Sequence, residues 1–326
     1  MITILAYRFS AFGDVAMTVP VVTEFLEQNP DIRIVFVTRK NFQDLFHGIQ
    51  NLVFKGVNID DYKGVFGMQK LTRELTDEFK PDFVADLHNV IRTKILSRIF
   101  KRKGFKVSII NKGKKEKEHL TDVWNLEKTP LKKTTERYAD VFRELGFPLI
   151  LSHHYRTSES HKNGIGFAPF AQHEGKMLPL EKSFELARIL SQKHRIYFFG
   201  GGKYEVETLN KWVSQIPNSE NVAGKLSLIK ELAQIAKLEI MISMDSANMH
   251  LASLAGTRCI SVWGATHPFA GFLGYGQSDD DVVQVIDLTC RPCSVFGDKK
   301  CYREDWACLH EINIQQIIDK VNKDEP

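Results

Sequence analysis

Long apolar runs are absent from this 326-residue chain, and no apolar stretch reaches the roughly 18 residues that a membrane-spanning helix needs. Residues 1–7 (MITILAY) lack the basic start and the long apolar core of a signal peptide, and their composition is typical of a buried strand. We therefore expect a cytoplasmic protein that does not cross a membrane.

Cysteine and excess charge are scarce as well. The five cysteines do not pair evenly, and a disulfide framework is not expected in a reducing compartment. The formal net charge of +4 is too small to indicate a nucleic-acid binder from the total alone. The turn after the first predicted strand contains neither G-x-G-x-x-G nor G-K-[ST], which argues against nicotinamide-dependent and ATPase chemistry.

The chain does contain an alternation of strands and helices. Short β-branched or aromatic runs predict strands, and patterns with a period of 3.6 residues predict helices between them. In the N-terminal half the predicted strands are 2–7, 32–38, 83–86 and 106–110, and the predicted helices are 14–28, 69–79, 91–100 and 134–145. This order is typical of a parallel sheet covered by helices.

A second series follows the polar passage 152–163, which has no periodicity and which we interpret as an interdomain linker. Strands are predicted at 164–168, 195–199, 239–243, 259–263 and 282–286, and helices at 180–192, 204–215, 226–236, 246–255 and 314–322. We therefore expect an α/β fold made of two similar halves with a cleft between them.

The most informative segment is 238–268, where polar residues stand between a predicted strand and a predicted helix. Asp245 and Ser246 occupy this helix start, where free backbone N–H groups and the helix dipole favour an anion. The next predicted strand ends at Gly264 and Thr266, so two strand ends contribute to one ligand crevice. An ordinary capped helix is the alternative interpretation.

Two further loops carry candidate chemistry. Asp14 follows the first predicted strand, where its carboxylate could accept a proton, and the preceding Gly13 would permit a close approach. A plain N-cap aspartate with a turn glycine is the alternative. Lys176 follows the predicted strand 164–168, and its ammonium group could lie over a diphosphate, although a solvated lysine is the simpler interpretation.

The segment 98–119 is dense in lysine and arginine. It is either a solvated face or a basic rim that attracts a phosphorylated acceptor or anionic lipid, at roughly 1 kcal/mol for each basic residue near such a surface. The lack of interleaved aromatic residues argues against single-stranded nucleic acid.

Four late cysteines, Cys290, Cys293, Cys301 and Cys308, supply the thiols that a tetrahedral zinc site needs. The second pair is spaced more widely than in usual zinc sites. Reduced, partly buried thiols are therefore favoured over a structural zinc ion.

Together these segments resemble the heptosyltransferase family, glycosyltransferase family 9, which includes the lipopolysaccharide core heptosyltransferases. Three signatures carry the resemblance in order: residues 8–14, Lys176 ahead of Pro179, and residues 245–250 followed by 264–268. Ala247 replaces the usual glycine, and Leu178 stands where an aromatic residue is common. The cysteine segment is similar to one found in part of the family, which weakens the argument that zinc is required.

The resemblance implies a GT-B architecture, in which two Rossmann-like domains with parallel sheets face a central cleft. Residues 1–155 would bind the acceptor and residues 156–326 the nucleotide sugar. The resemblance leaves open whether the last helix packs back on the N-terminal domain. It also implies an inverting glycosyltransferase that moves a sugar, with heptose from ADP-heptose as the leading form, onto a lipopolysaccharide core or related lipid-linked or phosphorylated saccharide. The expected acceptor lies at the inner face of the cytoplasmic membrane, so peripheral attachment of the protein to that membrane is left open. No cofactor is expected to be required, and no nucleic acid is expected as a partner.

By the same resemblance, Asp14 is the general base, Lys176 neutralises the leaving diphosphate, and Asp245 binds hydroxyl groups of the donor sugar. The other donor-side residues would be Ser246, Ala247, His250, Gly264 and Thr266, and the acceptor-side residues would be Arg8, Ser10, Gly13 and Arg92. A nucleotide-sugar epimerase of the same architecture and a non-catalytic binding module remain as alternatives. The sequence identifies neither the acceptor, nor the exact donor, nor the oligomeric state.

Overall fold

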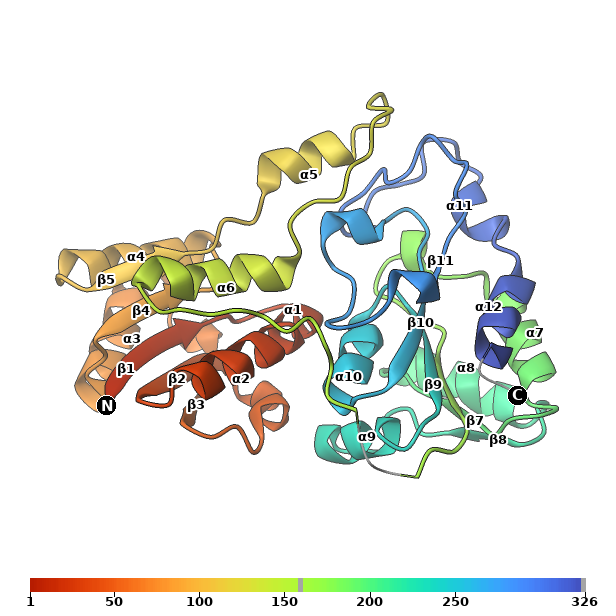
Figure 1. The fold of residues 1–326 in the computed structure, drawn as a ribbon, viewed down its shortest axis with the longest axis horizontal. Helices are drawn as coiled ribbons and strands as arrows, with labels where there is room; N and C mark the ends of the chain where they lie inside the picture. The colour runs from red at the N-terminus through yellow and green to blue at the C-terminus, as the bar shows by residue number, and fades with distance from the viewer. Residues whose placement is uncertain (158–160, 324–326) are drawn as a thin grey trace. The chain divides into compact units, whose positions relative to one another are not determined.

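The computed structural model describes residues 1–157 and 161–323, in which the chain forms two compact units (Figure 1). The first unit comprises residues 1–114 and 132–152. The second comprises residues 115–131 and the described residues from His153 onward. Residues 158–160 of the predicted linker lie outside the described part, and the rest of that passage forms neither helix nor strand.

The first unit contains a five-stranded parallel sheet with the order β3-β2-β1-β4-β5. Its strands are β1 (Ile2–Tyr7), β2 (Ile32–Arg39), β3 (Leu52–Val57), β4 (Phe83–Asp86) and β5 (Lys106–Ile109). Residues 4–7 of the central strand β1 are fully buried, which explains its nearly continuous apolar sequence. Tyr7 is in register with Val37 and Asp86, so the residues that follow β1 and β4 emerge at the same edge.

The helices of the first unit are α1 (Phe12–Ala16), α2 (Thr18–Gln28), α3 (Gly64–Phe79), α4 (Ile91–Arg102) and α6 (Thr134–Leu145), whereas α5 (Lys114–Leu120) belongs to the second unit from its second residue onward. Helix α2 packs against α6, and α3 packs against α4. The core between sheet and helices includes Leu5, Val35, Leu75, Val84 and Phe100, all fully buried.

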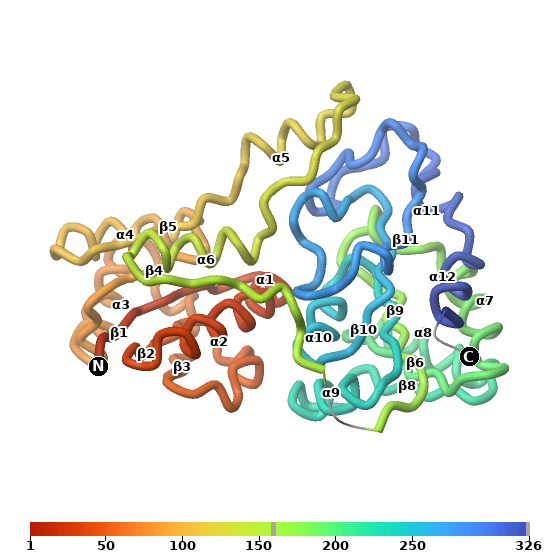
Figure 2. Tube along the Cα trace, in the orientation of Figure 1, coloured from red at the N-terminus to blue at the C-terminus, as the bar shows by residue number. Residues whose placement is uncertain are grey.

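The second unit contains a six-stranded parallel sheet with the order β11-β10-β9-β6-β7-β8, which can be followed in Figure 2. Its strands are β6 (Ile165–Ala168), β7 (Ile196–Phe198), β8 (Ser219–Asn221), β9 (Ile240–Met244), β10 (Arg258–Val262) and β11 (Val282–Val283). Its helices are α7 (Leu180–Leu190), α8 (Lys203–Val213), α9 (Leu228–Ile235), α10 (Ala247–Ala255), α11 (Ala307–His310) and α12 (Ile314–Asn322). The last helix, α12, packs against α7 and β10.

Most of the predicted elements are confirmed, but several are corrected. The predicted helix 14–28 is two helices, since α1 begins at Phe12 and Met17 separates it from α2. Helix α3 begins five residues before the predicted position, at Gly64. Strands β3 and β8 and helices α5 and α11 were not predicted, because each is short, polar or partly exposed and so lacks a strong apolar period.

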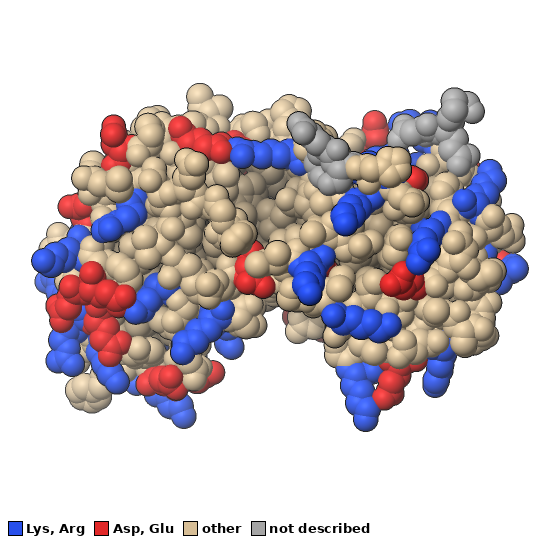
Figure 3. Space-filling model, turned by 90° about the horizontal axis from the view of Figure 1, so that it is seen from below, with Lys and Arg blue, Asp and Glu red and all other residues tan. Residues whose placement is uncertain are grey.

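No helix among the described residues is long and apolar enough to cross a membrane. Figure 3 shows acidic and basic side chains interspersed on one face of the molecule. The small net charge is therefore not gathered into a single patch on that face.

Candidate active site

In the first unit, Arg8 and Asp14 form an ion pair where β1 ends. The Arg8 guanidinium Nη2 lies 2.7 Å from Asp14 Oδ2, and Arg8 Nη1 donates to the Leu87 carbonyl at 2.7 Å. The Asp14 side chain is 27% exposed, whereas that of Arg8 is 5% exposed. The carboxylate is therefore held in one orientation while part of it remains accessible.

The alternative interpretation of Asp14 as an N-cap is wrong. Ala11 is the N-cap of α1, and Asp14 is the third helical residue, whose Oδ2 accepts a hydrogen bond from the Ala11 backbone N–H at 3.3 Å. Gly13 lies inside the same helix, where its carbonyl accepts from the Met17 backbone N–H at 2.9 Å.

A second carboxylate, Asp86, ends the neighbouring strand β4 and is fully buried. It accepts hydrogen bonds from the backbone N–H groups of His88 and Asn89, both at 2.8 Å, and from Ser97 Oγ at 2.9 Å. Asp86 already accepts three hydrogen bonds, and these bonds hold the loop after β4 in place. Asp14 is consequently the better placed of these two carboxylates to accept a proton from a ligand.

His88 lies beside the predicted acceptor residue Ser10, a contact that the sequence did not reveal. His88 Nδ1 accepts from the Phe9 backbone N–H at 3.5 Å, and its Nε2 lies 3.3 Å from Ser10 Oγ. Burial, together with the nearby cations, Arg8 first, lowers the pKa of His88 to about 3. The imidazole is therefore neutral at physiological pH and carries its proton on Nε2, which donates to Ser10 and leaves the Ser10 hydroxyl free to donate to a ligand.

A pocket of about 580 Å³ opens next to these residues. Ser10 and Arg92, both predicted on the acceptor side, line it together with His88, Arg39 and Lys94. Arg92 Nη1 lies 3.0 Å from a carboxylate oxygen of Asp60. Three basic side chains around one pocket favour an anionic ligand.

In the second unit, three of the predicted donor-side residues meet directly. Lys176 ends a single 3₁₀ turn (Glu174–Lys176), and its Nζ lies 2.9 Å from Asp245 Oδ2. Thr266 Oγ1 donates to the same oxygen at 2.8 Å. Asp245 is 6% exposed and Lys176 17%, so a largely buried ion pair lies at the point where β9 and β10 end.

The start of α10 lies next to this cluster along the chain. Ser246 is its N-cap, but the Ser246 hydroxyl makes no hydrogen bond to the helix backbone and lies 3.2 Å from Ser243 Oγ. Ala247 is the first helical residue, and His250 is buried one turn later. Because the cap side chain is engaged elsewhere, the first N–H groups of α10 keep their capacity to bind an anion.

Gly264 is required by a close approach of two loops. A Cβ atom at this position would lie 2.4 Å from Leu309 Cδ2 and 2.7 Å from the Gly175 carbonyl oxygen. The Ala265 backbone N–H donates to that same carbonyl at 2.8 Å. The loop that carries Thr266 is thereby attached to the turn that carries Lys176.

Arg291 supports this loop and was missed by sequence reasoning. It is 5% exposed, and its guanidinium donates to the carbonyls of Gly264 at 2.8 Å, Thr266 at 2.9 Å and Trp263 at 3.3 Å. Burial lowers the pKa of Arg291 to about 10, so it remains charged at neutral pH. Because Arg291 lies between Cys290 and Cys293, the local sequence pattern indicates metal binding and not support of this loop.

All five cysteines are free. Burial, reinforced by the neighbouring cysteines, raises the pKa of Cys293, and burial raises that of Cys308 to about 12. Within the described ranges, no group of three or more histidine, cysteine, aspartate or glutamate side chains is arranged to hold a metal ion. The zinc hypothesis for Cys290, Cys293, Cys301 and Cys308 therefore gains no support. The backbone of this segment instead contacts the donor-side loop, since the Cys293 N–H donates to the Ala265 carbonyl at 3.1 Å.

Curated relatives of the chain are heptosyltransferases. It is 26% identical to the lipooligosaccharide heptosyltransferase 2 of Campylobacter jejuni serotype O:6 over 254 residues, which are 75% of this chain and 76% of the relative. It is 24% identical to the lipopolysaccharide core heptosyltransferase OpsX of Haemophilus influenzae, over 97% of this chain and 95% of the relative.

The fold also matches solved structures. The E. coli heptosyltransferase WaaC with ADP-2-deoxy-2-fluoro heptose superposes with a TM-score of 0.70 at 17% identity, and the match covers 99% of each chain. The two α/β units, each with a sheet of parallel strands, thus have the Rossmann-like folds of the GT-B class, as predicted. The model of glycosyltransferase family 9 (heptosyltransferase) matches residues 68–302, and the chain belongs to this family of glycosyltransferases.

Proposed function

We propose that the protein transfers a heptosyl group from ADP-heptose to a lipopolysaccharide or lipooligosaccharide core acceptor, with inversion at the anomeric carbon. The first unit would bind the acceptor and the second the donor. The observation that carries the proposal is the cluster of Lys176, Asp245 and Thr266, held where two parallel strands end, which is the usual ligand position in open α/β sheets. Membership of the heptosyltransferase family and the names of the relatives support the choice of heptose.

On the acceptor side, Asp14 would act as the general base. An aspartate is too weak a base to remove an alcohol proton in advance, so the proton must move to Asp14 as the acceptor oxygen attacks the anomeric carbon. The ion pair with Arg8 orients the carboxylate for this step. The Ser10 hydroxyl, oriented by neutral His88, would donate a hydrogen bond to the acceptor.

On the donor side, the bond from the anomeric carbon to the diphosphate breaks, and ADP leaves with the electron pair. An ammonium group has three donors, so Lys176 can keep its contact with Asp245 and still bind a phosphate oxygen. The N–H groups at the start of α10, at Ala247 and beyond, would bind the other phosphate oxygens. Fixed donors of this kind stabilise the charge that develops on the leaving group.

The test is a direct transfer assay. The purified protein is incubated with ADP-heptose and a core oligosaccharide or lipid acceptor lacking the terminal heptose, and ADP release and the mass of the product are measured. We expect a mass increase of one heptosyl unit, with UDP- and GDP-sugars inactive as donors. The product at the acceptor should have the anomeric configuration opposite to that of the donor.

Other outcomes would identify a different function. Conversion of a nucleotide sugar in the absence of any acceptor would indicate an epimerase. Tight binding of nucleotide sugar with no turnover on any acceptor would indicate a binding module. We place the reaction at the inner face of the cytoplasmic membrane, and recovery of the protein on vesicles that contain the acceptor lipid would test that location.

A further inference from the structure

The segment 291–306 runs through the cysteine motif and packs directly against Lys176 of the donor side. Within this segment, Gly297 is buried and has a φ of 76°. A Cβ atom added at Gly297 would lie 2.6 Å from Lys176 Cγ and 3.2 Å from both Lys176 Cδ and Cε. The Gly297 backbone is therefore in contact with most of the aliphatic stem of Lys176, and no side chain fits between them.

The turn that carries Gly297 is held by its own hydrogen bonds, and we call residues 294–298 the Gly297 turn. Ser294 Oγ accepts from the backbone N–H groups of Gly297 at 2.9 Å and of Phe296 at 3.3 Å. The same hydroxyl donates to a carboxylate oxygen of Asp298 at 2.8 Å, and Ser294 is 1% exposed. Because none of these bonds involves Lys176, the turn forms a wall whose position does not depend on the lysine.

The segment is also anchored to the loop after β10. The backbone N–H groups of Cys293 and Ser294 donate to the Ala265 carbonyl at 3.1 and 3.3 Å. The Arg291 guanidinium donates to other carbonyls of the same loop. The Gly297 turn is thus fixed relative to the end of β10, where the donor-side cluster lies.

Trp306 extends the contact to the main chain just before Lys176. A Cβ atom at Gly175 would lie 2.9 Å from Trp306 Cζ3 and 3.1 Å from the Gly297 carbonyl oxygen. Trp306 is partly buried and packs against the core of the second unit. The stem of Lys176 and the main chain next to it are therefore both in contact with the segment 291–306.

This packing restricts where the Lys176 ammonium group can lie. A lysine stem loses rotational freedom when its ammonium binds a ligand, and this loss weakens binding unless the stem is already confined. The Gly297 turn confines the stem, and Asp245 Oδ2 lies 2.9 Å from Lys176 Nζ at its end. The ammonium group is thereby preorganised before a ligand arrives.

We propose that Gly297 is a positioning residue for the donor diphosphate and that it acts through Lys176, whose ammonium the Gly297 turn holds in place. The inference rests on the proposed function, because it takes the diphosphate as the ligand of Lys176. In a Gly297→Ala variant the added methyl group displaces the stem by roughly 1 Å to restore ordinary van der Waals contact. A displacement of this size moves the ammonium away from the position of the phosphate oxygens.

The first test measures ADP binding by calorimetry. We expect the Kd for ADP to rise at least about tenfold in Gly297→Ala, since a displaced ammonium loses a charge-assisted contact. Gly48→Ala is the matched control, because Gly48 has a φ of 78° and nothing in the described chain lies within 4 Å of the Cβ that it would gain. Both variants place a side chain at positive φ, but only one meets Lys176, so the control should bind ADP like the wild type. An unchanged Kd in folded Gly297→Ala, or no ADP binding by the wild type, overturns the proposal.

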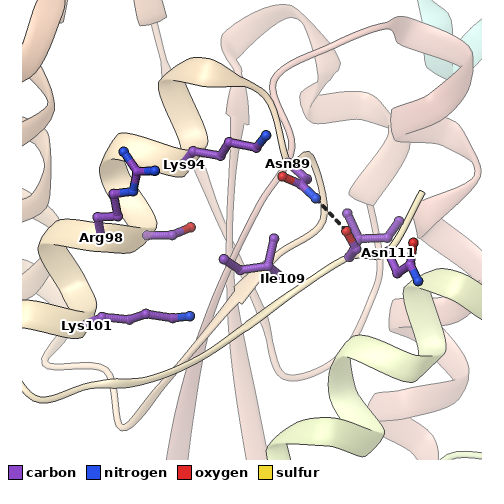
Figure 4. Close-up of a pocket in the computed structure, with 8 residues that line it drawn as sticks. Asn89, Lys94, Arg98, Lys101, Ile109 and Asn111 are labelled. Atoms are coloured by element: carbon purple, nitrogen blue, oxygen red, sulfur yellow. Dashed lines mark hydrogen bonds between the residues drawn. The ribbon is translucent and has the colours of Figure 1, made fainter. Parts of the chain in front are cut away.

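The second test is a double-mutant cycle, which separates action through Lys176 from a general structural effect. In a Lys176→Ala background the stem is absent, so adding Gly297→Ala should change the Kd for ADP by less than about twofold. The control background is Lys101→Ala. Figure 4 shows Lys101 on α4, beside a pocket of about 510 Å³ in the first unit. In that background Gly297→Ala should still weaken ADP binding about tenfold. Equal losses in the Lys176→Ala and Lys101→Ala backgrounds would show that Gly297 does not act through Lys176.

A second variant covers the case in which Gly297→Ala does not fold. Ser294→Ala releases the N–H groups of the Gly297 turn without adding an atom. We expect it to weaken ADP binding at least about threefold in the wild-type background and to have no effect in the Lys176→Ala background. Equal effects in the two backgrounds, or none in either, overturn the proposal.

Kinetics separate this proposal from the proposed function. Gly297→Ala should raise the KM for ADP-heptose and lower kcat, with the KM for acceptor unchanged. Transfer by the wild type, with losses that add independently in the cycle, would refute the positioning role alone. Absence of transfer, together with ADP binding that depends on Gly297 only when Lys176 is present, would refute the proposed function and leave the positioning role standing.

Discussion

Replacing Asp14 with asparagine is the sharpest test of the proposed chemistry. The amide keeps an oxygen that can accept from Arg8 and from the Ala11 backbone N–H, which bond Asp14 Oδ2 at 2.7 and 3.3 Å, but it cannot take up a proton. Loss of general-base catalysis lowers turnover by about 10²–10⁴-fold, or about 3–5 kcal/mol in the activation barrier. Because the carboxylate is partly exposed, we expect the lost ion pair to lower the unfolding free energy by only about 1–2 kcal/mol.

The assay separates catalysis from folding and from donor binding. Initial rates of ADP release are measured at saturating ADP-heptose and acceptor over a range of pH, and ADP affinity is measured by calorimetry. The Asp14→Asn variant should bind ADP like the wild type and should lose the acid limb of the pH–rate profile that a titrating carboxylate produces. Asp31→Asn, an exposed position just before β2, is the control for removing one negative charge.

A small effect would refute the reasoning. If the Asp14→Asn variant keeps turnover within about threefold of the wild type at saturating substrates, well short of the loss expected for a general base, another group accepts the proton. Retained activity in Asp14→Ala, which also deprives Arg8 of its partner, would extend that conclusion to the ion pair.

Three further predictions concern the donor side and the buried histidines. Lys176→Ala should weaken ADP binding at least about tenfold and also lower kcat, as measured by calorimetry and initial rates, and unchanged ADP affinity would remove Lys176 from the donor site. Gly264→Ala should weaken ADP binding and lower the melting temperature, since its Cβ would meet the Gly175 carbonyl at 2.7 Å, whereas Gly201→Ala, with open space around it, should change neither. The pKa values of His88 and His267 are both lowered to about 3 by burial, so the unfolded chain binds more protons than the folded one between about pH 6.5 and 3. The free energy of unfolding therefore decreases as the pH falls from 6.5 to 3, by up to about 1.4 kcal/mol per pH unit for each histidine. In the His88→Gln variant the melting temperature should depend less steeply on pH over this range. An unchanged slope in that variant would contradict the assignment of His88 as a buried neutral group.

The strands and their order of appearance could be predicted because both sheets are parallel and buried on both faces. Strand β1, for example, is a short apolar run whose type does not depend on distant contacts. The edge strand β3 was missed because its residues are mostly half-buried and include Lys55 and Gly56, which weaken its pattern. The break at Met17 was missed because the apolar period continues through it.

The candidate site was predictable where function-bearing residues follow strand ends. Asp14, Lys176 and Asp245 each lie in a segment that follows a strand, and the sequence alone indicates that the segments after parallel strands meet at one edge of their sheet. Their partners were harder to predict. His88 reaches Ser10 only because β1 and β4 are neighbours in register, although the two residues are 78 positions apart in the chain.

Arg291 contributes to the candidate site although it lies within the cysteine motif, whose pattern indicates a different role. The cysteines around it suggest metal chemistry, whereas its guanidinium donates to carbonyls of the loop that carries Thr266. Thr266 in turn holds Asp245, the partner of Lys176. Burying a cation costs free energy, and the described partners of Arg291 in this loop are carbonyls. The buried guanidinium holds the loop in place and adds positive potential beside the cluster that we propose binds a diphosphate. Only the tertiary path of the chain from β10 to α11 reveals this arrangement, because nothing in the local pattern of residues 290–293 encodes the carbonyls to which Arg291 donates.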